Sequence, residues 1–168
     1  AIIMCPSIPI LYCPANPDNA TFPADLAFLV AGVVDYFDAS AGTPDLATLT
    51  AYDCIFTWAN YAYSDNVAMG DNLAAFADQG GRVILGQWCL PTAGNFLSGT
   101  IMTDSYCPAT ASSYTFGGMD YSQDGVECIY DSVELITSLS CDYRDNISAW
   151  TNGAVDGTYL DGQNIAAF

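Results

Sequence analysis

The sequence predicts an α/β fold in which a parallel sheet carries helices on both faces. Tyr52–Trp58 is a run of apolar, aromatic and β-branched residues, which is typical of a strand buried on both faces. Met69, Leu73 and Phe76 follow at positions i, i+4 and i+7, so they share one face of a helix. Arg82–Gly86 reads as a second buried strand. Two strands joined by a helix in this way are expected to run parallel, with a right-handed crossover.

The first half of the chain extends this alternation. Ser64 and Asp65 are candidate N-caps of the central helix, and Gly80-Gly81 is its expected end. Upstream, the pattern predicts a strand at Ile8–Ala15, followed by a helix that Thr21 and Pro23 open and Gly32 ends. Leu26, Leu29 and Val30 share one face of this helix. A second strand is expected at Val33–Asp38, and then a short helix at Asp45–Thr50 with Thr43 as its cap. The order βαβαβαβ therefore predicts a flavodoxin-like parallel sheet.

Two segments of the central stretch carry a family resemblance. They read Leu46…Leu49…Tyr52-Asp53-Cys54-Ile55-Phe56 and Gly70-Asp71-Asn72-Leu73…Phe76-Ala77-Asp78-Gln79-Gly80-Gly81-Arg82-Val83-Ile84. The pattern resembles the class I glutamine amidotransferase-like superfamily, and most closely its secreted, ThuA-like branches. The resemblance extends over residues 8–100 and concerns fold rather than catalysis. It implies a sheet of the amidotransferase type.

Composition and charge restrict the class of partner. The chain has 168 residues, of which 52% are hydrophobic, so we expect a single folded domain over residues 1–168. Nineteen acidic and two basic residues give a net charge of −17, with Arg82 and Arg144 as the only cations. Such a surface repels nucleic acid and anionic membranes. No apolar run approaches the roughly 20 residues of a membrane-spanning helix, so we expect no membrane insertion.

Cysteines and glycosylation motifs indicate an extracellular or cell-surface protein. No CxxC pair occurs and histidine is absent, which disfavours a zinc site. We expect up to three disulfides among Cys5, Cys13, Cys89, Cys107, Cys128 and Cys141, with Cys54 as a buried free thiol. Cys107–Cys128 is the preferred pair and Cys13–Cys54 an alternative. Asn19 and Asn146 each begin an N-glycosylation sequon, so N-linked glycans are expected.

The second half of the chain is less regular. Residues 87–127 are rich in Gly, Ser, Thr, Tyr and Pro, and they predict loops pinned by disulfides, with room for a short hairpin. Strands are expected at Val133–Leu139, Asn146–Trp150, Thr158–Leu160 and Ile165–Phe168, as a terminal antiparallel extension of the sheet. Tyrosines in these loops are suited either to protein and sugar contacts or to covering the ends of the sheet.

The missing residue types argue against an enzyme. Without histidine, neither a Ser-His-Asp nor a Cys-His-Glu triad can form, and without lysine there is no Schiff base. Amidotransferases of the resembling superfamily carry their nucleophilic cysteine on a sharp turn after a strand. Leu85–Leu90 is similar to that turn and contains Cys89, but its base is missing. We therefore interpret Cys89 as half of a disulfide and expect no catalytic residues.

One motif suggests a metal. Asp120, Ser122, Asp124 and Asp131 have the spacing of a calcium-binding loop, with Gly125 at the sharp turn. Chance turns in an Asp-rich chain are the alternative interpretation. No other cofactor is expected. A carboxylate pair for glycoside hydrolysis is a further alternative, although no spacing selects one pair among the 19 acids.

The start of the sequence suggests self-association. Residues 1–7 begin with the apolar segment Ala1, Ile2, Ile3 and Met4. This segment is expected either to pack on its own domain or to insert as an arm into a neighbouring subunit. The leading hypothesis is a non-catalytic extracellular module, a subunit of a secreted fibre, coat or cell-surface assembly that forms oligomers or filaments. The alternative is a carbohydrate-binding or carbohydrate-processing module, because ThuA-like proteins are linked with sugar metabolism.

Overall fold

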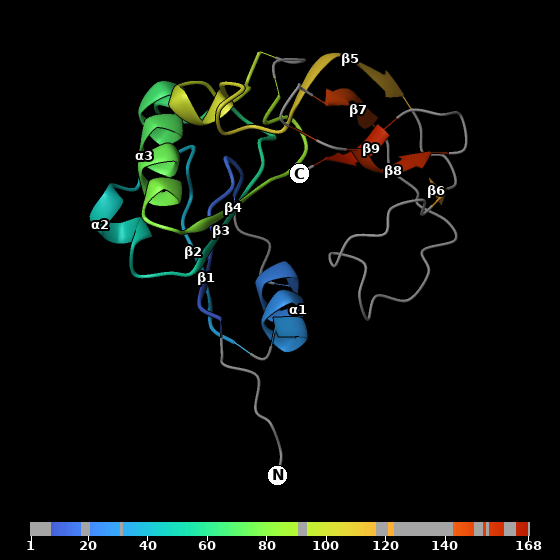
Figure 1. Cartoon of the computed structure of the whole chain (residues 1–168). Coiled ribbons are helices and arrows are strands. Elements are labelled where there is room, and N and C mark those ends of the chain that lie inside the picture. The colour runs from blue at the N-terminus through green and yellow to red at the C-terminus, as the bar shows by residue number, and fades with distance from the viewer. Residues whose placement is uncertain are drawn as a thin grey trace. The chain divides into compact units, whose positions relative to one another are not determined.

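The chain divides into two compact units (Figure 1). The computed structural model describes residues 8–17, 21–30, 32–90, 94–116, 121–122, 143–149, 153, 155–159 and 164–167. The first unit contains residues 1–89 and 95–101, and the second contains residues 90–94 and 102–168. The prediction of a single domain over residues 1–168 stays a prediction.

A four-stranded parallel sheet forms the centre of the first unit. Its strands are β1 (Ile10–Tyr12), β2 (Val34–Tyr36), β3 (Cys54–Thr57) and β4 (Arg82–Leu85). They lie in the order β2-β1-β3-β4, and every neighbouring pair is parallel. This is the order of the first four strands of a flavodoxin-like sheet, so the predicted parallel core is confirmed.

Helices cover both faces of this sheet (Figure 1). The helices are α1 (Thr21–Val30), α2 (Leu46–Leu49) and α3 (Asn66–Asp78). The predicted inner face of α3 is confirmed, because Met69, Leu73 and Phe76 are all buried. On the other face, Phe22 of α1 packs against Tyr12, with 4.8 Å between the ring centroids.

The helix ends follow from local hydrogen bonds. Asp65 caps α3, since its carboxylate accepts hydrogen bonds from the backbone N–H groups of Val67 (3.1 Å) and Ala68 (2.9 Å). After α3, Gly80 adopts the left-handed conformation, with φ of 88°. The prediction that Thr43 caps α2 is wrong. The cap is Asp45, whose carboxylate accepts the N–H of Thr48 at 2.8 Å.

The second unit contains a separate antiparallel sheet. Its strands are β5 (Ala109–Phe116), β6 (Tyr121–Ser122), β7 (Tyr143–Ala149), β8 (Val155–Tyr159) and β9 (Asn164–Ala167), in the order β5-β7-β9-β8-β6. Three of the short antiparallel strands expected near the C-terminus are confirmed as β7, β8 and β9. The idea that they extend the parallel sheet is wrong, because β9 pairs with β7 and β8, and these two strands pair in turn with β5 and β6.

One further expectation needs correction, and another concerns residues that the structure does not describe. Residues 87–127 are not irregular throughout, because they contain the eight-residue strand β5 and a 3₁₀ helix, η1 (Thr100–Met102). Cross-strand pairing with β7, from Ala109↔Ala149 to Phe116↔Tyr143, holds this stretch extended. The strand predicted at residues 133–139 lies outside the described residues.

Candidate functional site

The carboxyl ends of β1, β3 and β4 are the place where an open α/β sheet usually binds its ligand. Here the protein's own side chains bond to one another at that edge. The indole N–H of Trp58 donates to the hydroxyl of Tyr12 at 2.7 Å. The side-chain amide of Asn60 donates to the Oδ1 atom of Asn16 at 3.1 Å. These bonds connect the segment after β3 with β1 and with the segment that follows β1.

A buried polar cluster lies just beneath this edge. The hydroxyl of Thr57 donates to the Cys13 carbonyl oxygen at 2.7 Å and lies 2.9 Å from the hydroxyl of Tyr63. The Tyr63 hydroxyl lies 3.4 Å from the sulfur of Cys89, which also lies 3.5 Å from the Thr57 carbonyl oxygen. Burial raises the pKa of Tyr63, and the neighbouring Cys89 raises it further. Tyr63 is therefore neutral at physiological pH and acts as a packed hydrogen-bonding group.

The turn after β4 differs from a nucleophile turn. Trp88 has φ of 65°, a left-handed conformation that costs free energy for a residue with a bulky side chain. The strained position is therefore occupied by Trp88, and Cys89 comes one residue later. Cys89 is 0% exposed, so its sulfur faces the buried cluster rather than solvent.

Four of the seven cysteines are described. Cys13, Cys54, Cys89 and Cys107 are buried, and no disulfide joins any two of these four. Burial, with the charge of Asp38 as a smaller cause, raises the pKa of Cys13 to about 12.

The strand register excludes a bridge between Cys13 and Cys54. Cys54 is aligned with Ile10, three residues before Cys13. At about 3.3 Å per residue this offset is about 10 Å, beyond the reach of a disulfide. Cys5, Cys128 and Cys141 lie outside the described residues, so the remaining disulfide assignments stay predictions.

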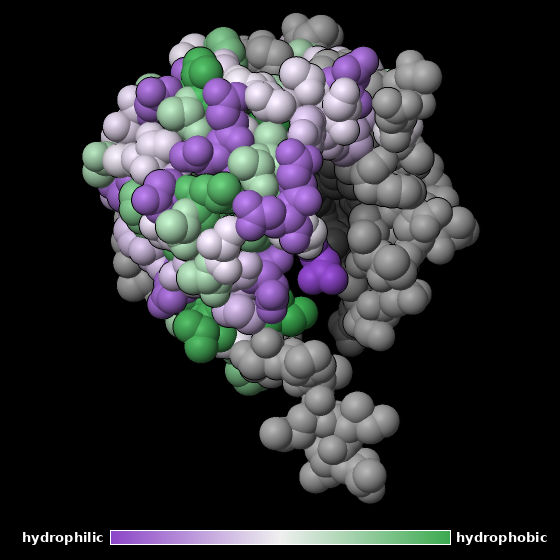
Figure 2. Space-filling view, turned by 60° about the vertical axis from the view of Figure 1, so that its left-hand side comes forward, coloured by the Kyte–Doolittle hydropathy of each residue, from purple (hydrophilic) through white to green (hydrophobic). Residues whose placement is uncertain are grey.

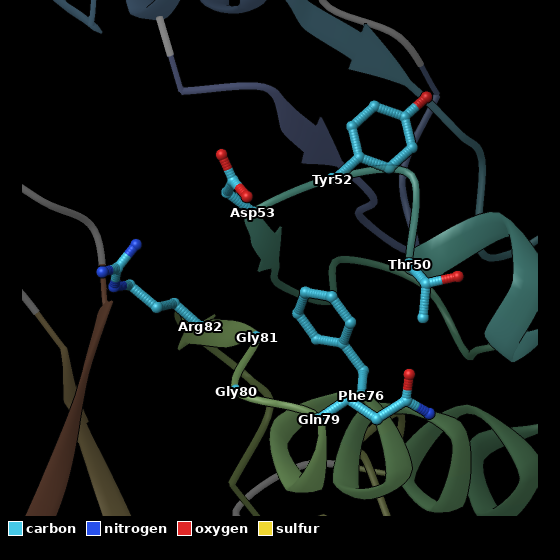
Figure 3. A pocket seen from close by; sticks show the side chains of 8 residues that line it. All are labelled: Thr50, Tyr52, Asp53, Phe76, Gln79, Gly80, Gly81 and Arg82. Atoms are coloured by element: carbon cyan, nitrogen blue, oxygen red, sulfur yellow. The ribbon is translucent and has the colours of Figure 1, made fainter. Parts of the chain in front are cut away.

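A polar pocket of about 370 Å³ opens at the opposite edge of the sheet (Figure 3). Its lining comes from the amino ends of β3 and β4 and from the end of α3: Thr50, Tyr52, Asp53, Phe76, Gln79, Gly80, Gly81 and Arg82. The backbone of Gly81 packs directly on the ring of Phe76, so a β-carbon would not fit there. Asp53 and Arg82 supply opposite charges that suit a small polar molecule.

The predicted calcium loop is only partly described. Ser122 lies in β6, where it pairs with Thr158 of β8. Asp120, Asp124 and Asp131 lie outside the described residues. The described residues contain no group of three or more acidic, cysteine or histidine residues that could hold a metal ion. The calcium site stays a prediction.

Of the two N-glycosylation sequons, the structure describes the asparagine of only one. Asn146 lies within β7, where its amide nitrogen donates to the hydroxyl of Ser113 at 2.8 Å and its Oδ1 accepts the hydroxyl of Thr115 at 2.9 Å. A glycan on Asn146 would be attached to that same nitrogen. Asn19 and the apolar segment 1–4 lie outside the described residues. Glycosylation at both sites stays a prediction.

The described residues contain no helix that is long and apolar enough to cross a membrane. Comparison with protein-family models, with curated proteins and with solved structures finds no match. Nothing in these comparisons links the chain to the glutamine amidotransferase-like superfamily, so that assignment stays a prediction.

Proposed function

We propose that this protein is a non-catalytic assembly module, a subunit of an extracellular fibre, coat or cell-surface structure. The observation that carries the proposal is the burial of Cys89 at the carboxyl edge of the parallel sheet. Cys89 is the cysteine in the turn that resembles a nucleophile turn. It is 0% exposed and contacts Tyr63 and Thr57. A group buried in this way supports packing rather than attack on a substrate.

The composition supports the same proposal. The sequence has no histidine and no lysine, so the common bases and Schiff-base nucleophiles are missing from the whole chain. The raised pKa of Tyr63 keeps its proton in place at neutral pH, so this hydroxyl is a poor base.

Exposed apolar side chains favour a role in association. Phe28 on α1 is 86% exposed, and Val33 just before β2 is 57% exposed. Large apolar groups in solvent are favourable to bury against a partner. The cysteines, the two sequons and the acidic composition favour an extracellular location for that association.

The test is the size of the full chain in solution, measured by light scattering and negative-stain microscopy over a range of concentrations. We expect oligomers or filaments that grow with concentration. Salt should promote assembly, because like subunits of net charge −17 repel one another and ions screen that repulsion. A monomer at every concentration and ionic strength would refute the proposal.

The alternative, a carbohydrate-binding module, is favoured by the pocket at the amino ends of β3 and β4. Asp53, Gln79 and Arg82 offer both hydrogen-bond donors and acceptors to a polyhydroxylated ligand (Figure 3). A glycan screen tests this alternative. Micromolar binding that is lost in both Asp53→Asn and Arg82→Ala would replace the assembly proposal, whereas no binding would remove the alternative.

A further inference from the structure

The free edge of β4 is the clearest incomplete feature of the first unit. In the sheet formed by the described residues, β4 pairs with β3 on one side and forms an edge on the other. The N–H of Arg82 donates to Asp53 at 3.2 Å, and that of Gly86 donates to Thr57 at 2.8 Å. Because a parallel strand alternates the direction of its hydrogen bonds, the N–H and C=O groups of Val83 and Leu85 point away from β3.

The side chains of β4 also lack full cover. Tyr12, Phe56 and Ile84 are aligned across β1, β3 and β4 on one face of the sheet. Phe22 of α1 packs on Tyr12 and Phe56, at 4.8 Å and 5.7 Å between ring centroids. Ile84 remains 53% exposed. An apolar side chain therefore stands in solvent beside a row of outward-pointing backbone groups.

Few protective features occur at this edge. Natural proteins block edge strands with proline, lysine, bulges or covering loops. Residues 82–85 contain no proline or lysine, and they pair with β3 in an unbroken register. Arg82, at the start of the strand, is its only charged residue. By contrast, the side of the molecule seen in Figure 2, where α2 and α3 come forward, mixes hydrophilic residues among small hydrophobic patches.

We infer that the edge of β4 binds the apolar segment Ala1–Met4 of a second copy of the chain as an added strand. The inference rests on the proposed function and names the contact that would build the assembly. Ala1, Ile2, Ile3 and Met4 form a run of apolar residues that can pair with β4 along its free edge. Backbone hydrogen bonds supply affinity in such strand addition, and the isoleucines can cover Ile84.

The reach of the segment favours a second copy over the same chain. From β1 to a strand outside β4 there are three strand spacings of about 4.8 Å, or about 14 Å. Met4 is four residues from Ile8, and four fully extended steps span only about 13–14 Å. No length would remain to run along β4. Since each copy offers one segment and one edge, the contact is head-to-tail and can continue into a ring or filament.

The test separates the donor segment from the acceptor edge. Ile84→Lys places a charge on the edge and should leave the chain monomeric at concentrations tenfold above those at which the unmodified chain assembles. Val67→Lys is the matched control, because it makes the same charge change at an apolar residue of α3 that is 50% exposed, close to the 53% of Ile84. It should assemble like the unmodified chain. Circular dichroism verifies that both variants fold.

A mixing experiment makes the design decisive. A chain lacking residues 1–4 retains only the edge, and Ile84→Lys retains only the segment. Each should be monomeric alone, and their mixture should give a 1:1 dimer that does not grow. If the mixture stays monomeric, or if Ile84→Lys assembles like the unmodified chain, the inference is overturned while the proposed function stands. If the unmodified chain never assembles, both are overturned.

Discussion

The variant Gly70→Ala tests whether residues 95–101 belong to the first unit. Gly70 lies inside α3, where replacing glycine by alanine normally stabilises a helix by about 1 kcal/mol. Here an added β-carbon would overlap the carbonyl oxygen of Ser98. It would also lie 2.8 Å from the Ser98 carbonyl carbon and 3.1 Å from the Cγ2 atom of Ile101. The expected sign is therefore reversed.

The size of the effect follows from what must move. The backbone of Ser98 is held by its N–H bond to Asn66 (3.2 Å), and the next turn is held by the Thr100 N–H bond to Asp71 (2.8 Å). Displacing the loop weakens both hydrogen bonds, and the backbone bond between Ser98 and Asn66 contributes about 1 kcal/mol. Overpacking adds about 1–3 kcal/mol, and the helix gain offsets about 1 kcal/mol. We expect a net loss of about 1–3 kcal/mol in the free energy of unfolding.

Urea unfolding followed by tryptophan fluorescence measures this loss. Gly94→Ala is the control, because a β-carbon at Gly94 meets no atom within 4 Å and should change stability by less than about 0.5 kcal/mol. If Gly70→Ala is as stable as the unmodified protein or more stable, the loop does not pack on α3 and the reasoning fails.

Three further predictions concern the buried cluster and the titrating groups. Thr57→Val should cost about 1–3 kcal/mol in urea unfolding, and the double variant with Tyr63→Phe should lose less than the sum of the two single losses; strictly additive losses would contradict a shared network. The pKa of Cys13 is raised from 9.0 to about 12, so the contribution of this thiol to stability should be constant below pH 9 and fall by about 1.4 kcal/mol per pH unit between pH 9 and about 12. Cys13→Ala should reduce that slope, and an unchanged slope would indicate that Cys13 carries no titrating thiol. Hydrogen bonds from Thr100 lower the pKa of Asp71, so its stabilising effect should be present above pH 3.8 and lost as the pH falls through the lowered pKa. Asp71→Asn should weaken this acid dependence in unfolding curves measured between pH 2 and 5, and an identical dependence would argue against the bond.

Much of the parallel unit could be predicted from local patterns. The helix face of Met69, Leu73 and Phe76, the cap at Asp65 and the helix end at Gly80 all depend on residues close together in sequence. Such patterns act through helix periodicity and local backbone hydrogen bonds, so they can be read without knowing the fold. Asp45 could have been identified as a cap, because it directly precedes Leu46 and Thr48 lies three residues later.

The candidate sites were harder to predict, because they depend on distant pairs. The contact between Thr57 and Cys13 joins residues 44 positions apart, and Tyr63 meets Cys89 across 26 positions. No local signal in the sequence indicates that these groups share one buried cluster. The pocket beside Arg82 likewise forms only when the starts of β3 and β4 are brought together.

The sequence by itself determined the alternation of strands and helices up to Leu85, the absence of the usual catalytic bases and the strong negative charge. Only the tertiary structure decided that β4 lies at an edge, that Cys89 is buried and that β5 to β9 form a sheet of their own. The physical reason is that periodicity and capping are local, whereas strand order and burial depend on which distant segments pair.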